Sequence, residues 1–150
     1  MTAELDKTNL RATAGRVFQY MISEHPADTD QVVGVDVDPV SWGLNINRWD
    51  WNPGVGLNSI LAYYHDSHNP AALEYLVGWV QRNKHLARKF QHVNVMTPFA
   101  IFPDLYRLTG DAFYRETALD YSDWIIKNLV RTMTGAFQHG GEHQHLEQLP

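Results

Sequence analysis

The chain has 150 residues, a length that suits one domain with a substantial hydrophobic core. Its formal net charge of −5, without a cluster of Lys and Arg, argues against non-specific nucleic-acid binding, and the lack of cysteine excludes disulfide and thiolate chemistry. A charged N-terminus and no long apolar run predict neither a secretory signal nor a membrane anchor, and hence a cytoplasmic protein.

The first predicted element is an amphipathic helix over residues 3–24. Apolar side chains, Leu10 and Phe18 among them, recur there at helical spacings, and Pro26 follows its end. Residues 27–52 contain the run "VVGVDVDPV", which glycine and proline interrupt. We therefore expect a long, partly extended connection with at most a short strand, and connections of this length often carry function.

The connection ends in "NRWDWNPGVG", where two tryptophans flank an acid. Alternation along an extended segment predicts that Trp49 and Trp51 lie on one side and Asp50 on the other. Pro53 suits the first turn of a helix, which we place at residues 54–66. The two rings either line a binding pocket or hold the loop against the core, and the local pattern favours neither.

Two helical hairpins follow. The first pairs the helix at 54–66 with one at 71–83, and Asn69 is the predicted N-cap ahead of a proline. The second pairs helices at 98–108 and 112–129, between which Gly110 suits a left-handed cap and Asp111 suits an N-cap.

The two hairpins read as one unit used twice. Tyr64 and Tyr106 lie 42 positions apart, and Asn69 matches Asp111 at the same offset. Periods of this size are typical of stacked helical hairpins, in an open solenoid or a closed ring.

Loops at the ends of the hairpins hold the candidate functional residues. The stretches "HVNVMTPF" at 92–99 and "GAFQH" at 135–139 both lie beside a predicted helix end, as the tryptophan pair does. A pocket that gathered them would combine aromatic rings with a few hydrogen-bonding groups, as carbohydrate sites do. Its residues would be Trp49, Trp51, Asn94, Gln138 and His139. Alternatively, Asn94 is only a helix cap and His139 only a surface residue.

Other acids and histidines are weaker candidates. Asp36 with Asp38, and Asp120 with Asp123, could form carboxylate pairs for glycoside hydrolysis, but solvated faces of a strand and a helix explain them better. The histidines at 139–145 could be read as metal ligands, yet their Gly-rich context and the lack of a second ligand set favour no metal.

At four stretches the sequence resembles glycoside hydrolase family 105, the unsaturated rhamnogalacturonyl hydrolases, which are related to family 88. The stretches are "NRWDWNPGVGL", "VNVMTP", "LYRLTGDAFYRETALDYSDWI" and "TGAFQH", and they run in the family's order from Asn47 to His139. The resemblance implies an all-α fold, the (α/α)6 barrel of six helical hairpins. Residues 1–150 would be a single domain that forms an incomplete, N-terminal part of this toroid.

The resemblance also implies a reaction. A hydrolase of pectin degradation removes a 4,5-unsaturated galacturonyl residue from rhamnogalacturonan oligosaccharides. An aspartic acid protonates the enol-ether double bond and water adds at the neighbouring carbon, so one carboxyl serves as acid and base and no cofactor is used. The expected partner is thus an unsaturated pectin-derived oligosaccharide, with no nucleic acid and no membrane.

Site residues follow from the resemblance. Trp49 and Trp51 would wall the sugar pocket, Asn94 would lie beside the reacting sugar, and His139 would close the loop that also carries Gln138. The general acid belongs to a "W-x-D" segment that we expect beyond Pro150. Residues 1–150 alone are therefore expected to show little activity, and the open half-ring to favour self-association.

Two other functions compete. One is a non-catalytic helical-hairpin module that binds a sugar or a protein partner. The other is a sugar epimerase on the same toroid, which is the weakest reading because only the tail histidines could serve as its acid and base.

Overall fold

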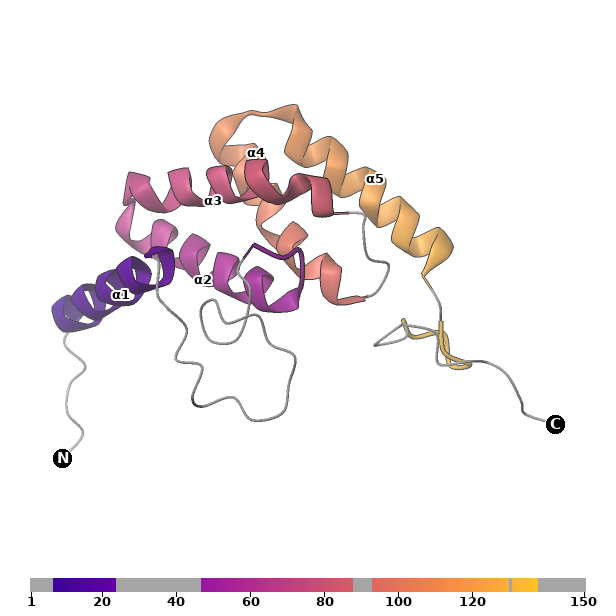
Figure 1. Cartoon of the computed structure of the whole chain (residues 1–150), viewed down its shortest axis with the longest axis horizontal. Coiled ribbons are helices and arrows are strands. Elements are labelled where there is room, and N and C mark those ends of the chain that lie inside the picture. The colour runs from indigo at the N-terminus through magenta and orange to yellow at the C-terminus, as the bar shows by residue number, and fades with distance from the viewer. Residues whose placement is uncertain (1–6, 24–46, 88–92, 130, 138–150) are drawn as a thin grey trace.

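The structure is a computed structural model that describes residues 7–23, 47–87, 93–129 and 131–137 (Figure 1). Within these ranges every regular secondary-structure element is an α-helix or a 3₁₀ helix, and the only β-pairing is an isolated bridge between Arg131 and Phe137. No helix in the described ranges is long and apolar enough to cross a membrane. The helices are α1 (Lys7–Ile22), α2 (Trp51–Ser67), α3 (Pro70–Asn83), η2 (Lys84–Leu86), η3 (Val93–Ile101), α4 (Phe102–Thr109) and α5 (Ala112–Asn128).

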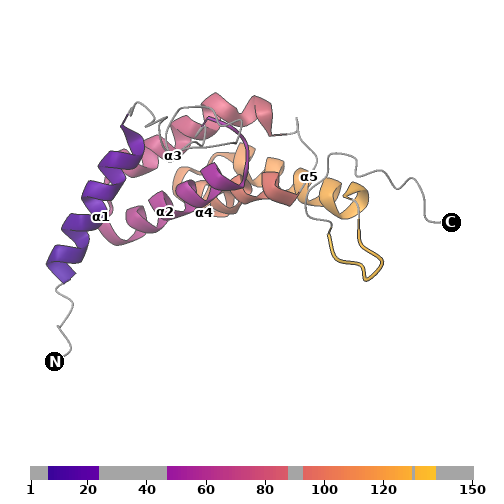
Figure 2. The ribbon, with the colours of Figure 1, turned by 60° about the horizontal axis from the view of Figure 1, so that its bottom comes forward.

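Two hairpins organise the fold. Helices α2 and α3 form the first, and α4 and α5 form the second, while α1 packs along α2 at one end of the molecule (Figures 1 and 2). The 3₁₀ helix η3 leads into α4 and has its main packing partner in α2. The second hairpin is thereby attached to the N-terminal half of the first.

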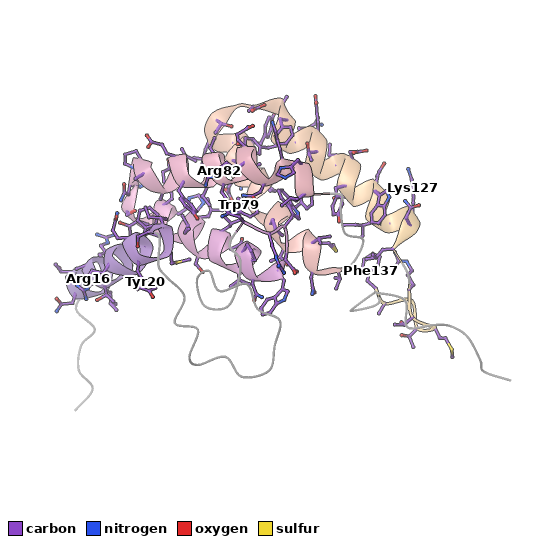
Figure 3. The ribbon with its side chains drawn as sticks, viewed as in Figure 1. Arg16, Tyr20, Trp79, Arg82, Lys127 and Phe137 are labelled. Atoms are coloured by element: carbon purple, nitrogen blue, oxygen red, sulfur yellow. The ribbon has the colours of Figure 1, made fainter. Side chains whose placement is uncertain are left out.

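A continuous aromatic core joins the hairpins. Trp79 of α3 is fully buried in the middle of the structure, whereas Lys127 lies near its outer edge (Figure 3). The ring of Trp49 lies 5.3 Å from that of Trp79, and the ring of Phe99 stacks on Tyr121 at 4.3 Å between centroids. These contacts run from the loop before α2 to α5. The apolar side chains of each hairpin are therefore buried partly by the other hairpin.

The turn between the two helices of a hairpin is built twice in the same way. The side-chain oxygen of each N-cap accepts a hydrogen bond from the N–H group two residues later, at 3.1 Å for Asn69 and 2.9 Å for Asp111. The residue before each cap, His68 or Gly110, has a left-handed backbone with φ of 53° or 72°. These contacts confirm the predicted N-caps Asn69 and Asp111, and they show that the same turn geometry recurs 42 residues apart.

Most predicted helices agree with the structure at their described residues. The predictions at 3–24, 54–66, 71–83 and 112–129 correspond to α1, α2, α3 and α5. Helix α2 begins three residues earlier than predicted, because Asp50 rather than a residue next to Pro53 provides its cap. The predicted extended connection at 27–52 lies outside the described residues up to position 46.

The prediction of a helix from Pro98 to Leu108 is wrong at its start. Residues Val93–Ile101 form a 3₁₀ helix with Pro98 inside it, and the α-helix begins at Phe102. A second proline, Pro103, occupies the first turn of α4, where its missing N–H group removes no helical hydrogen bond. The correct signal for the helix start was Pro103.

Candidate functional site

The two tryptophans of the "RWDWN" stretch lie in opposite environments. The side chain of Trp49 is 1% exposed, whereas Trp51, the first residue of α2, is 48% exposed. Asp50 between them has an extended backbone, and its Oδ1 accepts a hydrogen bond from the N–H of Trp51 at 2.7 Å. The expectation that both rings share one side is wrong, because the chain turns into a helix at Trp51 and no longer alternates.

Trp49 belongs to the core. Its indole Nε1 donates a hydrogen bond to the carbonyl oxygen of Val95 at 2.9 Å, and its ring lies 5.0 Å from that of Phe99 and 6.1 Å from that of Phe102. A side chain enclosed in this way presents no face on which a sugar ring could stack. Of the two readings that the sequence left open, packing against the core holds for Trp49.

Asn94 is the second residue of η3 and is partly buried. It does not hold the N-cap position of an α-helix, since α4 begins eight residues later. Its carbonyl oxygen accepts a hydrogen bond from Thr97 Oγ1 at 3.0 Å, which closes a tight turn of η3. The backbone that carries the Asn94 side-chain amide is therefore restrained by a hydrogen bond within η3 itself.

A glycine brings α2 and η3 together. A Cβ atom on Gly54 would lie 2.6 Å from the Cβ of Thr97 and 2.8 Å from the backbone nitrogen of Pro98. Only a residue without a side chain allows this approach. The close contact places the segment that carries Asn94 against the first turns of the helix that begins with Trp51.

The N-terminal end of α2 presents an aromatic and apolar surface. Trp51 and Val55, one helical turn apart, are 48% and 53% exposed. The exposed Arg48 precedes them and provides positive charge, whereas the partial charge of the helix N-terminus faces the Asp50 carboxylate that caps it. Such a surface can stack a flat ring and stabilise a neighbouring carboxylate. Sequence reasoning missed Val55 and Arg48, although the spacing of Trp51 and Val55 signals a shared helix face.

The segment after α5 forms a tight hairpin. The N–H of Thr132 donates to the carbonyl oxygen of Ala136 at 2.8 Å, Gly135 has a φ of 86°, and the guanidinium of Arg131 lies 4.2 Å from the ring centroid of Phe137. Phe137 is labelled below the end of α5 in Figure 3. The next two residues, Gln138 and His139, were expected at the sugar site and lie outside the described residues.

The remaining candidates provide no site within the described chain. Asp120 and Asp123 of α5 are exposed, and Asp123 pairs with Lys127 at 3.5 Å, so the prediction of a solvated face is confirmed. Asp36, Asp38 and the histidines of the tail lie outside the described residues. Among the residues that are described, no three potential metal ligands cluster.

Comparison with known proteins gives three findings. The family model of Glycosyl Hydrolase Family 88 matches residues 21–149. The unsaturated rhamnogalacturonyl hydrolase YesR of Bacillus subtilis (strain 168) is 25% identical over 91 residues, which cover 61% of this chain and 26% of YesR. A crystal structure from Salmonella enterica subsp. enterica serovar Paratyphi A str. ATCC 9150, described as a possible member of the GH105 family, matches with a TM-score of 0.73 at 20% identity.

The structural match covers 93% of this chain and 37% of the solved chain. At this identity it shows the fold alone: helical hairpins that make up part of an (α/α)6 toroid, as the family resemblance implies. The chain therefore spans about a quarter of the curated relative and somewhat more than a third of the solved one.

Proposed function

Because this chain belongs to glycosyl hydrolase family 88, we propose that it forms part of an enzyme that removes a 4,5-unsaturated galacturonyl residue from rhamnogalacturonan oligosaccharides. The curated relative YesR is named for unsaturated rhamnogalacturonyl hydrolysis, which supports this choice of substrate. Residues 1–150 would belong to a single (α/α)6 domain.

The observation that carries the proposal is the surface at the start of α2. Trp51 offers an exposed ring for the flat unsaturated sugar, and the adjoining η3 carries the amide of Asn94. Arg48 supplies positive charge for the sugar carboxylate. Gln138 and His139, which follow Phe137 in the sequence, would bind the same ligand.

In the proposed reaction a carboxylic acid protonates the enol-ether double bond, and water adds at the neighbouring carbon. The carboxylate takes the proton of the water, the hemiketal opens, and the glycosidic bond is released. Trp51, Asn94 and Arg48 bind and orient the sugar, and none of them acts as the general acid. No cofactor takes part in these steps.

The test uses an unsaturated galacturonyl-rhamnose disaccharide, whose conjugated double bond absorbs in the ultraviolet. Calorimetric titration measures binding to the purified chain, and absorbance measures turnover by the chain and by a version extended through the next "W-x-D" segment of the gene. We expect binding by both and loss of absorbance with the extended version. The saturated disaccharide is the matched control, and it should keep its glycosidic bond. Absence of both binding and turnover in both versions would overturn the proposal.

A further inference from the structure

The buried hydrogen bond of Trp49 joins two segments that carry proposed ligand-binding residues. Trp49 precedes Trp51 in the loop that enters α2, and its partner Val95 follows Asn94 in η3. The donor Nε1 and the acceptor carbonyl are 2.9 Å apart in a region without solvent access. A bond of this kind fixes the distance between the two backbones, because breaking it would leave a buried carbonyl without a partner.

The backbone of η3 around Asn94 is held at three points. Trp49 binds the carbonyl of Val95, Thr97 Oγ1 binds the carbonyl of Asn94, and Gly54 admits Thr97 and Pro98 at a distance that no side chain would allow. Two of these restraints come from the stretch that also holds Trp51. The backbone position of Asn94 relative to the start of α2 is thus set by this stretch.

We propose that Trp49 is a positioning residue, which holds Asn94 at the sugar site through its indole N–H and does not itself touch the sugar. This inference rests on the proposed function for the identity of the ligand. Packing alone does not account for the choice of residue, because a phenylalanine would fill much of the same core between Phe99 and Phe102. Only tryptophan combines a large ring with an N–H donor that reaches the Val95 carbonyl.

The test removes the donor and keeps an aromatic ring. In Trp49→Phe we expect the side-chain amide resonance of Asn94 to move in nuclear magnetic resonance spectra, and the affinity for the unsaturated disaccharide to fall about tenfold, since small displacements of a binding group weaken its contacts strongly. The control is Asn69→Ala, which removes the cap of α3 and destabilises the fold at the far end of α2. It should leave both readouts unchanged.

A second variant keeps the test valid if Trp49→Phe fails to fold. Replacing the Trp49 indole by the sulfur analogue benzothiophene keeps the two-ring shape and deletes only the N–H donor. An unchanged Asn94 resonance and unchanged affinity in this folded variant would overturn the proposal. If neither the native chain nor the extended version binds the disaccharide, the proposed function fails, while the Asn94 resonance still decides whether Trp49 positions this residue.

Discussion

His68 and Gly110 hold the same left-handed backbone conformation, 42 positions apart, at the C-terminal ends of α2 and α4. Their φ angles are 53° and 72°, and their N–H groups donate to the carbonyl oxygens of Tyr64 and Tyr106 at 2.8 and 2.9 Å. The same turn is therefore built once with glycine and once with a residue whose Cβ is strained in this conformation.

We predict that His68→Gly stabilises the chain by about 0.5–1 kcal/mol, because it relieves the strained φ angle at an exposed cap. Urea denaturation followed by circular dichroism measures the change as a shift of the midpoint. The reciprocal variant Gly110→Ala should lower stability by a similar amount. A lower midpoint for His68→Gly would contradict this account of the turn.

A second prediction concerns the contact between α2 and η3. Gly54→Ala should destabilise the chain by roughly 1–3 kcal/mol, since the new methyl group would overlap the backbone at Pro98. The matched control is Gly78→Ala on α3, where the new methyl group meets only the end of the Arg82 side chain at 3.1 Å. That variant should be neutral or slightly more stable, because alanine favours the helix. Equal midpoints for the two variants would contradict the close packing inferred here.

A third prediction follows from the ion pair between α1 and α2. Arg11 Nε lies 3.0 Å from Asp66 Oδ2, and the hydrogen bond from Arg11 lowers the pKa of Asp66 below its ordinary value of 3.8. A depressed carboxyl pKa contributes stability above the ordinary value, and this contribution is lost as the pH falls through the lowered pKa. Both side chains are exposed, so salt should weaken the effect.

The measurement compares the urea midpoints of the native chain and Asp66→Asn. The variant should be slightly less stable at neutral pH, and the difference should vanish at a pH well below the ordinary carboxyl pKa. Arg11→Gln should show the same loss at neutral pH, and the double variant should lose no more than either single one. A difference that grows on acidification would contradict the prediction.

A fourth prediction separates binding from folding at Trp51. Because the side chain is about half buried, Trp51→Ala should lower the free energy of unfolding by roughly 1–2 kcal/mol and leave the chain folded. Its affinity for the unsaturated disaccharide should nevertheless fall at least about tenfold, since the ring provides the stacking face. Leu119→Ala, at a similarly exposed apolar residue on α5, should leave the affinity unchanged. Equal affinities of all three proteins would contradict the role of Trp51.

The sequence predicts the hairpins well because their ends are set by local chemistry. Asn69 and Asp111 act within two residues of their own position, so their cap geometry could be read directly from the chain. Histidine adopts the left-handed conformation only in a small minority of cases, so its own identity did not predict the cap at His68.

The sequence could not show which of Trp49 and Trp51 is buried, because burial depends on residues that are distant along the chain. Burial of Trp49 depends on Val95 and Phe99, which lie more than forty residues further along the chain. The 3₁₀ helix before Phe102 was likewise missed, since its tight turns depend on packing against Gly54. The local sequence pattern identifies the candidate residues. Tertiary packing then decides which of them can face a ligand.

The most direct test of the site is a titration of the ¹⁵N-labelled chain with the unsaturated galacturonyl-rhamnose disaccharide, followed by nuclear magnetic resonance. We expect the indole resonance of Trp51 and the side-chain amide resonance of Asn94 to shift together and saturate with one affinity, while resonances of α5 stay in place. Shifts confined to α5, or no shifts at all at saturating sugar, would contradict a binding site at the start of α2.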